Sequence, residues 1–531
     1  MSHHVELELP LTLERSGTQT LPAQLAAQLR ELIRTAVLPQ GTVLPATRQL
    51  ALRLNTSRGT VVAAYEQLLS EGYLQTAGRS TRVAPLPETL RTALLQHPSR
   101  GIISAPPPAA AAMAARPAAP RPRWDLTPGA SDSSLLPSAA WRAAWRGAAA
   151  APHSAYPETG SPRLQAALAD YLRLARTVVA DPHTILITSG ARDGLRQLLS
   201  ALSHSADSKR LTVAVETPGF ASLHRVPQAL GHHTIAIPVD AQGMNPALLP
   251  RGVAAPEVVL LTPSHQYPLG ASMPLRRRLE LLAWARQHGS ILVEDDYDSE
   301  LRYAGDPLPA LAALDKQRDC VATLGSFTKL LHAGVGLGYL TAPAQLQPAL
   351  LRLRADLGGT VSTVVQDALT EFLRSGAARH HIARMRREYR ARRNLVQQIL
   401  TPQVLAPRGL RLIPLDGGLH TVLQFDAAIG AGVDGVTGAS SAGGAASVIA
   451  AAVAGWSAED AAPQDWAAAE QQLVAELAAA GIAVSSLRRY WASGGAGGDE
   501  KYGIVFGYGG VDQPALREAV TAIATVLTGT R

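Results

Sequence analysis

Cysteine is almost missing from this chain of 531 residues, in which Cys320 is the single example. One cysteine cannot form a disulfide within the chain, which excludes a disulfide-rich secreted fold and suits a reducing compartment. Long uncharged apolar runs are missing too, because proline and glycine interrupt the alanine tracts, so no membrane span is predicted. Acidic residues Glu6, Glu8 and Glu14 stand where a signal peptide would be basic and then apolar. These features predict a cytoplasmic protein.

The chain is too long for one ordinary hydrophobic core, so two or more domains are expected. Apolar residues make up 47% and charged residues 17% of the chain, a balance typical of globular and not of disordered proteins. The formal net charge of +7 is a first indication of an anionic partner, although many basic proteins bind no nucleic acid.

Residues 21–84 have the pattern of a small domain of three helices and a hairpin. Apolar residues recur at helical spacing over 25–33, and a second helix is expected to open after Leu44. Asn55-Thr56-Ser57 offers a turn and an N-cap for a third helix that continues to Gly72. Two short strands are predicted at 73–75 and 81–83. This order predicts a winged helix-turn-helix, with the DNA-binding domain assigned to residues 15–84.

The start of the third predicted helix carries the residues expected to read DNA. This end of a recognition helix enters the major groove, where arginine reaches base edges or phosphate. Residues 21–84 hold seven arginines and three glutamates, as neutralisation of phosphates requires. A packing module of three helices would explain the leucines but not these polar residues. The predicted DNA contacts are Ser57, Arg58 and Thr60 on this helix, Arg48 before it, and Arg79 and Arg82 on the wing.

Composition then changes to alanine and proline over residues 85–123, which predicts a linker that is semi-rigid where proline dominates. A second, larger domain is expected over 124–531. Within it, residues from about 427 to 463 are rich in alanine, glycine and serine and are predicted to form a flexible insertion without chemistry.

A lysine, two hydroxyl residues and a carboxylate form the main candidate site. Gly325-Ser326-Phe327-Thr328-Lys329 follows an apolar run at 321–324, and Glu294-Asp295-Asp296 follows another at 291–293. Such runs predict buried strands, and α/β sheets bind ligands at the carboxyl ends of their strands. An isolated lysine is usually a solvated surface residue, so the neighbouring motifs carry the weight of this interpretation.

An aldehyde cofactor with a phosphate and a pyridine nitrogen needs these residue types. Lys329 would form the imine and act as the catalytic residue, and Asp295 would keep the ring nitrogen protonated so that the ring can act as an electron sink. Ser326 and Thr328 would donate hydroxyl hydrogen bonds to the phosphate. The turn after the strand predicted at 185–188 precedes a helix, and its backbone N–H groups would favour an anion.

The segments TPSHQYPLG (262–270), EDDYDSELRY (294–303) and SFTKLLHAGVGLGY (326–339) resemble fold-type I pyridoxal-phosphate enzymes of the aminotransferase superfamily. They look more specifically like the MocR subfamily of GntR-type transcriptional regulators. LPATRQLALRLNTSRGTVVAAYEQLLSEGYL (44–74) resembles the GntR DNA-binding signature, with Asn55 in place of a usual glycine. The resemblance implies a mixed, mostly parallel α/β sheet behind a winged helix.

The resemblance also implies roles for further residues. Ala191 and Arg192 would bind the cofactor phosphate through their amides, and Phe220 would stack on the ring. Tyr297 would donate to the 3-oxygen of the ring, and His265 is a further candidate for the same oxygen. Tyr156 would reach the cofactor phosphate of a second subunit, which implies a homodimer, although an ordinary loop tyrosine is the competing account.

Two departures from the family weaken an enzymatic interpretation. Gly336 stands seven residues after Lys329, where fold-type I enzymes place a phosphate-binding arginine. Val505 stands where aminotransferases place the arginine that grips the substrate α-carboxylate, and an apolar side chain does not replace a bidentate clamp. Both favour a sensor over an amino-acid transaminase.

The leading hypothesis is therefore a regulator that binds operator DNA as a homodimer and answers to pyridoxal 5′-phosphate or to an amine that displaces the lysine. One alternative is a working aminotransferase with an accessory DNA-binding module. Another is a relic in which the large domain binds no cofactor and only dimerises. No metal site is predicted.

Overall fold

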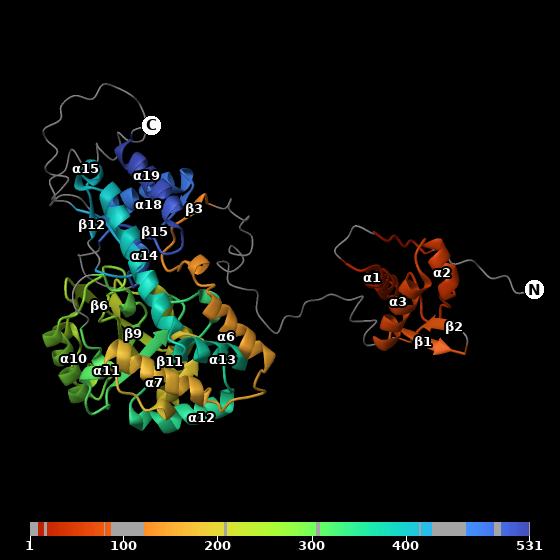
Figure 1. Cartoon of the computed structure of the whole chain (residues 1–531), viewed down its shortest axis with the longest axis horizontal. Coiled ribbons are helices and arrows are strands. Elements are labelled where there is room, and N and C mark those ends of the chain that lie inside the picture. The colour runs from red at the N-terminus through yellow and green to blue at the C-terminus, as the bar shows by residue number, and fades with distance from the viewer. Residues whose placement is uncertain are drawn as a thin grey trace, which may run out of the picture. The chain divides into compact units, whose positions relative to one another are not determined.

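The computed structural model describes residues 9–14, 19–78, 80–85, 122–205, 210–303, 308–413, 416–426, 463–492 and 501–529. The chain divides into two compact units, residues 1–119 and 120–531, and Figure 1 draws both. Arg79 and nearly all of the predicted linker and insertion lie outside the described residues.

The first unit contains the three helices and the hairpin that the sequence predicts. Its elements are α1 (Leu21–Arg34), α2 (Thr47–Arg53), α3 (Arg58–Ser70), β1 (Leu74–Ala77) and β2 (Ser80–Val83), and the two strands pair antiparallel. Leu25, Leu29 and Leu68 are fully buried in a core that belongs to this unit. Between α2 and α3, Asn55 has φ +48°, a left-handed conformation that asparagine tolerates better than most residues. The turn therefore forms without the glycine usual in this family.

The second unit is built around one large sheet, which has eight strands within the described ranges. In spatial order they are β4 (Leu186–Thr188), β11 (Gly338–Thr341), β10 (Val321–Ser326), β9 (Ile291–Asp296), β8 (Val258–Leu261), β5 (Thr212–Thr217), β6 (His233–Asp240) and β7 (Gly243–Met244). Strands from β10 to β6 run parallel, whereas β4, β11 and β7 pair antiparallel with their neighbours. The predicted mixed, mostly parallel sheet is confirmed.

Helices cover both faces of this sheet (Figure 1). One core lies between the sheet and α8 (Ala191–Ser205), α9 (Ala221–Ala229) and α12 (Gln347–Leu357). Another lies between the sheet and α10 (Leu275–His288) with α11 (Leu311–Leu314). Because both faces are buried, β8 and β9 are buried along their whole length, and this includes the acidic residues 294–296 at the end of β9.

A smaller antiparallel sheet forms the C-terminal part of the second unit. Its strands are β12 (Leu410–Ile413), β13 (His420–Phe425), β16 (Gly503–Gly507) and β15 (Ser485–Ser486). Helices α18 (Pro463–Ala479) and α19 (Gln513–Thr528) pack beside it, and the long α14 (Ala377–Ile399) contacts α19. The remaining helices used below are α6 (Ala139–Ala150), α7 (Pro162–Arg176) and α13 (Thr363–Arg374). None of the described helices combines the length and apolar character needed to cross a bilayer.

Candidate functional site

The candidate site lies where β9 and β10 end. The two strands are parallel, with Leu324 opposite Asp295, so their carboxyl ends meet at one edge of the sheet. Asp295 is the fifth residue of β9, and Lys329 follows the last residue of β10 by three positions. The sheet therefore delivers the lysine and the carboxylate, which are far apart in sequence, to the same place.

Lys329 is partly buried, and its amine donates a hydrogen bond to the Gly129 carbonyl oxygen. Burial lowers the pKa of this amine, and the carboxylates of Asp298 and Asp295 partly oppose that effect. A lowered pKa raises the share of neutral amine, which is the nucleophilic form. Gly129 has φ +105°, and a Cβ there would lie 2.7 Å from the amine nitrogen, so glycine leaves the room that the lysine occupies.

Asp295 is buried, and neither of its carboxylate oxygens has a hydrogen-bond partner among the described residues. Burial raises its pKa well above the usual value, and nearby Asp296 and Asp298 add to the rise. A buried carboxyl group without partners is costly, so a ligand that supplies an N–H donor would relieve it. The protonated pyridine nitrogen of pyridoxal phosphate is such a donor, and the residues present fit that cofactor.

Glu216 is the next-to-last residue of β5 and adds a second buried carboxyl group to the site. One of its oxygens accepts hydrogen bonds from the Thr262 amide at 3.1 Å and the Thr262 hydroxyl at 2.6 Å. The other oxygen has no partner in the described part of the chain. Burial raises the pKa of Glu216 to about 7, and its charge contributes to the raised pKa of Asp295.

The predicted phosphate-binding residues come together at the other end of the site. The Ser326 hydroxyl donates to the Thr328 hydroxyl at 3.0 Å and accepts from the Thr328 amide at 3.2 Å. Ser326 pairs with Gly338, where a Cβ would lie 2.8 Å from the Gly190 Cα. Gly190 directly precedes α8, whose first residues are Ala191 and Arg192. The hydroxyls therefore neighbour the first turn of a helix, where amide groups have no partner within the helix.

The residues predicted to face the ring join one aromatic cluster. The ring of Phe220 lies 5.1 Å from that of Tyr267, and Tyr267 lies 5.9 Å from Tyr297. The Tyr297 hydroxyl donates to the His265 carbonyl oxygen at 2.9 Å, and His265 Nδ1 lies 2.9 Å from Asp298. Phe220, Tyr297 and His265 are thus brought together, while their contacts to a cofactor stay predictions.

Tyr156 lies apart from this cluster. Its hydroxyl donates to Asp367 on α13 and contacts His153, and none of its described contacts involves Lys329. Its assignment to the site of a second subunit stays a prediction.

The two departures from the family have clear positions. Val505 is buried in β16 and packs with Tyr267, Val422 and Tyr490, so its side chain fills apolar space. Gly336 has φ +53° and lies in a short turn, with no atom within 4 Å of the place of a Cβ. Neither position offers a guanidinium to a phosphate or a carboxylate.

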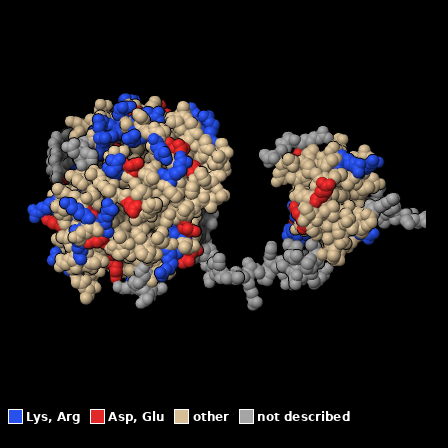
Figure 2. All heavy atoms as spheres, turned by 60° about the horizontal axis from the view of Figure 1, so that its bottom comes forward, with Lys and Arg blue, Asp and Glu red and all other residues tan. Residues whose placement is uncertain are grey.

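In the first unit, the predicted DNA-reading residues lie at the surface around the start of α3. Ser57 caps this helix by accepting the Thr60 amide at 3.1 Å. Arg48, Arg58 and Arg82 are exposed, and Figure 2 shows basic side chains on the visible face of this unit. An exposed helix N-terminus with adjacent arginines is the arrangement that enters a major groove.

Sequence reasoning missed four contributors to the candidate cofactor site. They come from distant parts of the chain. The sequence marked each of them only as a polar residue or a glycine at a strand end or in a loop, which does not by itself indicate a site. These residues are Gly129, Glu216, Asp298 and the buried His420, whose ring lies 4.7 Å from that of Tyr267.

Comparisons with known proteins agree with this architecture. Residues 21–83 match the profile of bacterial regulatory proteins of the gntR family, and residues 127–490 match that of aminotransferase class I and II. An archaeal alanine:glyoxylate aminotransferase has the same fold as the second unit, with a TM-score of 0.62 at 18% identity over 77% of this chain and 91% of its own.

Two regulators are similar to this chain over most of its length. The HTH-type pyridoxine biosynthesis transcriptional regulator PdxR of Corynebacterium glutamicum is 38% identical over 98% of this chain and 99% of its own length. The probable rhizopine catabolism regulatory protein MocR of Rhizobium meliloti is 33% identical over 79% of this chain and 84% of its own. With a gntR-type DNA-binding unit ahead of an aminotransferase-like unit, this chain belongs to the MocR-type family of GntR transcriptional regulators.

Proposed function

We propose that this regulator binds pyridoxal 5′-phosphate at Lys329 and that the bound cofactor changes its attachment to operator DNA. The observation that carries the proposal is the buried carboxyl group of Asp295, which has no hydrogen-bond partner among the described residues and lies in the electrostatic reach of the Lys329 amine. The 38% identity to a pyridoxine biosynthesis regulator over nearly the full chain supports the same cofactor. The proposed division of the chain is residues 15–84 for DNA, 85–123 as a linker and 124–531 for the cofactor.

When bound, pyridoxal phosphate supplies a reactive aldehyde on an electron-withdrawing ring. Lys329 would offer its amine to this aldehyde, and Asp295 would accept a hydrogen bond from the ring nitrogen. Ser326 and Thr328, with the first amides of α8, would bind the phosphate. Phe220 would cover the ring, and Tyr297 with His265 would donate to the 3-oxygen.

The site favours a sensor of the vitamer over a transaminase. An aminotransferase needs a cationic clamp for the α-carboxylate of its amino-acid substrate, and Val505 instead closes that position with an apolar side chain. We therefore infer that pyridoxal phosphate itself is the effector, with an amine that displaces Lys329 as the alternative effector. The competing function is an active aminotransferase with an accessory DNA-binding module.

The DNA-binding form is proposed to be a homodimer. Tyr156 would then complete the phosphate site of the partner subunit, and two winged helices would read two half-sites arranged as a direct repeat or a palindrome. A cofactor that binds one state of the dimer better than another shifts the population of DNA-binding states by that difference in affinity.

The test compares Lys329→Ala with Lys316→Ala, since Lys316 is an exposed lysine outside the site. Addition of pyridoxal phosphate should give a visible absorption band with the native protein and Lys316→Ala, and no band with Lys329→Ala. A footprint on DNA upstream of the protein's own gene should change with cofactor in the first two proteins and stay constant in the third. A band in Lys329→Ala, or a footprint indifferent to cofactor in the native protein, would contradict the proposal.

The enzymatic alternative has its own assay. The loaded protein is incubated with an amino acid and 2-oxoglutarate, and turnover is compared with that of free pyridoxal phosphate. A sensor gives no more turnover than the free cofactor, whereas rates well above it would support the aminotransferase.

A further inference from the structure

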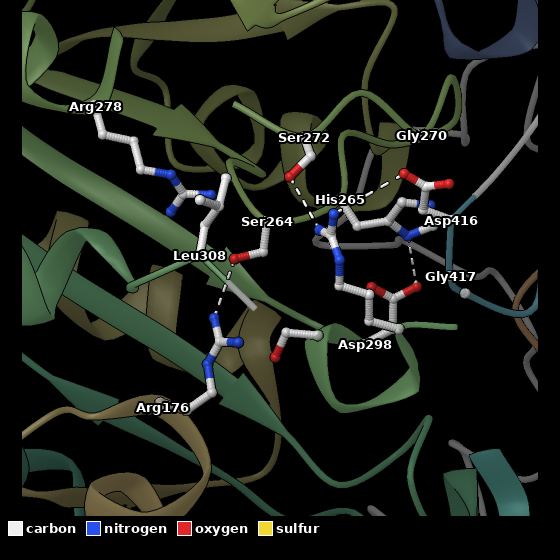
Figure 3. Close-up of a pocket in the computed structure, with 13 residues that line it drawn as sticks. Arg176, Ser264, His265, Gly270, Ser272, Arg278, Asp298, Leu308, Asp416 and Gly417 are labelled. Carbon is white, nitrogen blue, oxygen red and sulfur yellow. Dashed lines mark hydrogen bonds and ion pairs between the residues drawn. The ribbon is translucent and has the colours of Figure 1, made fainter. Parts of the chain in front are cut away.

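His265 and Asp298 form a buried pair that the proposed function uses only in part. His265 Nδ1 lies 2.9 Å from the Asp298 carboxylate, and the two side chains are 8% and 3% exposed. Figure 3 shows the side chains pointing toward one another on the wall of a cavity. The other ring nitrogen, Nε2, is buried and has no hydrogen-bond partner among the described residues. A buried polar atom without a partner is costly, so a ligand that supplies one would relieve it.

The hydrogen of the neutral His265 ring belongs on Nδ1. An ionised carboxylate only accepts hydrogen bonds, so the nitrogen that lies 2.9 Å from Asp298 has to donate. The Tyr297 hydroxyl lies 3.0 Å from Nδ1, but it gives its one hydrogen to the His265 carbonyl oxygen at 2.9 Å. Nε2 is therefore left with a lone pair. A carboxylate that fixes this tautomer also stabilises the ring after the ring has taken up a proton, as in the histidine bases of enzymes.

Gly418 keeps the pair in place. A Cβ at this position, where φ is +83°, would overlap the His265 ring and lie 2.9 Å from Asp298 Oδ2. The glycine is itself held, because its carbonyl oxygen accepts hydrogen bonds from the hydroxyls of Tyr303 and Tyr508. The ring and the carboxylate thus lie in a fixed cradle, which a base that acts at one atom needs.

The pair lies close to the Lys329 amine. Asp298 opposes the effect of burial on the pKa of this amine more strongly than Asp295 does. His420 lies in the electrostatic reach of both His265 and Lys329, and its ring centroid is 5.7 Å from that of His265. The pair therefore belongs to the part of the site where an amine would meet the cofactor.

The other titratable groups around His265 are poor bases. Burial lowers the pKa of His420 to about 3. Burial also raises the pKa of Tyr267 and of Tyr297 well above the usual value of 10, so both hydroxyls keep their protons at neutral pH. The charged groups on the rest of the cavity wall are those of Arg176, Arg278, Arg302 and Asp416. Guanidinium groups accept no proton, and the Asp416 carboxylate is 58% exposed to water.

We propose that His265, oriented by Asp298, is the base that takes a proton from a primary amine arriving at this site as an ammonium ion. An N–H bond of the ammonium breaks, its electron pair stays on the amine nitrogen, and the proton forms a bond to Nε2 with its charge beside the Asp298 carboxylate. Lys329 takes one proton when the amine displaces it, so the exchange needs no net proton. The inference rests on the function proposed above, in which a displacing amine is the alternative effector.

The same surroundings define the class of amine. The Asp298 carboxylate repels a second carboxylate, and Val505 fills with an apolar side chain the place where an aminotransferase clamps one. The amine is therefore one without an α-carboxylate. A His265 ring that has taken up the proton becomes a donor at Nε2, as its predicted role at the 3-oxygen requires.

The first measurement uses the full-length protein loaded with pyridoxal phosphate at pH 7.5. It is mixed with n-butylamine, which is an ammonium ion at this pH, or with methoxyamine, which is neutral and needs no base. Samples are reduced with borohydride at intervals, and their intact mass reports the fraction of chains that still carry the cofactor. His265→Asn, which keeps a donor for Asp298 and loses Nε2, should slow the exchange with n-butylamine about a hundredfold or more and leave that with methoxyamine nearly unchanged. His233→Asn, which changes an exposed histidine on β6, should alter neither rate.

Two further measurements do not depend on the His265→Asn protein holding its cofactor. Asp298→Asn should slow the exchange with n-butylamine in the same selective way but by less, because the ring stays and only the stabilisation of its proton weakens. Nitrogen-15 NMR of the cofactor-free protein reports the tautomer without any exchange reaction. The signals of the His265 ring, identified by their loss in His265→Asn, should place the hydrogen of the neutral ring on Nδ1.

Three results would each overturn the proposal. They are equal slowing of both amines, which indicates a structural role, an unchanged rate with n-butylamine, and a neutral ring with its hydrogen on Nε2. Any of them together with a visible band for the loaded native protein removes the base and leaves the proposed function standing. A native protein that gives no visible band with pyridoxal phosphate contradicts the proposed function, and the inference falls with it.

Discussion

Glu216 and Asp295 are both buried carboxyl groups, and burial raises the pKa of each. Burial thus favours the protonated form of both groups. A ligand with an N–H donor would offer Asp295 the hydrogen-bond partner that it lacks among the described residues.

The raised pKa of Glu216 predicts a pH-dependent stability of the cofactor-free protein. The folded state keeps a proton that the unfolded state loses above its pKa of 4.5, so the free energy of unfolding falls as pH rises from about 4.5 to about 7. Over that interval the loss from this one group is about 3 kcal/mol. Glu216→Gln should remove that part of the slope in thermal unfolding between pH 5 and 7.5.

The matched control is Glu280→Gln, which changes an exposed carboxylate on α10 and should leave the slope unchanged. A Glu216→Gln protein whose stability falls with pH as steeply as that of the native protein would show that this carboxyl group does not titrate as described.

At the scale of elements, the start of α3 depends on its cap. Ser57 accepts the Thr60 amide, one of the amides that have no partner within the helix. Ser57→Ala should lower the free energy of unfolding of the first unit by about 1 kcal/mol and weaken operator binding, because residues proposed to read DNA lie on this first turn. Chemical denaturation followed by the signal of this unit measures the first effect, and a DNA titration measures the second.

Ser70→Ala is the comparison, because Ser70 lies at the other end of α3 and its hydroxyl donates to the Gln67 carbonyl oxygen. It should change stability less and leave DNA affinity as it is. Equal losses in the two variants would mean that the cap has no special part in DNA binding.

Elements were also the level at which the sequence was most informative. The helical spacing over 25–33 and the apolar runs at 291–293 and 321–324 correspond to α1, β9 and β10, because one face or both faces of each element are buried. Parallel strand ends then implied that Asp295 and Lys329 meet. Periodicity carries no information on contacts such as that between Lys329 and the Gly129 carbonyl, which joins residues 200 positions apart.

The loop residues around Lys329 escaped prediction for the same reason. Gly129 and Asp298 lie in irregular segments, where neither helical nor strand spacing fixes the direction of a side chain. Val505 was recognised as a departure from the family, and its neighbours Tyr267 and Tyr490 became known from the fold. Site residues on strand ends were therefore predictable, and those that enter from loops were not.

On the scale of the whole molecule, the two units have separate cores, and this predicts separate unfolding. Pyridoxal phosphate at 100 times its dissociation constant should stabilise the unit that binds it by about 2.7 kcal/mol and leave the other unchanged. Calorimetry of the full chain should show the transition of the large unit moving to higher temperature and that of the winged helix staying in place.

Operator DNA should instead move the transition of the winged helix to higher temperature and leave that of the large unit in place. Lys329→Ala should abolish the shift caused by the cofactor and keep the shift caused by DNA. If the cofactor moves both transitions equally, the two units unfold together, and the separation of their cores would have no thermodynamic consequence.

The position of each core along the chain has a consequence for newly made molecules. The winged helix needs residues up to about Ala84, whereas the walls around Lys329 need Gly418 and the strand that contains Val505. Bacterial ribosomes add roughly 5–20 residues per second and domains fold as they emerge, so these two moments are separated by roughly 20 to 80 seconds. The winged helix can therefore fold while the large unit is still being synthesised, before the site proposed for the vitamer exists.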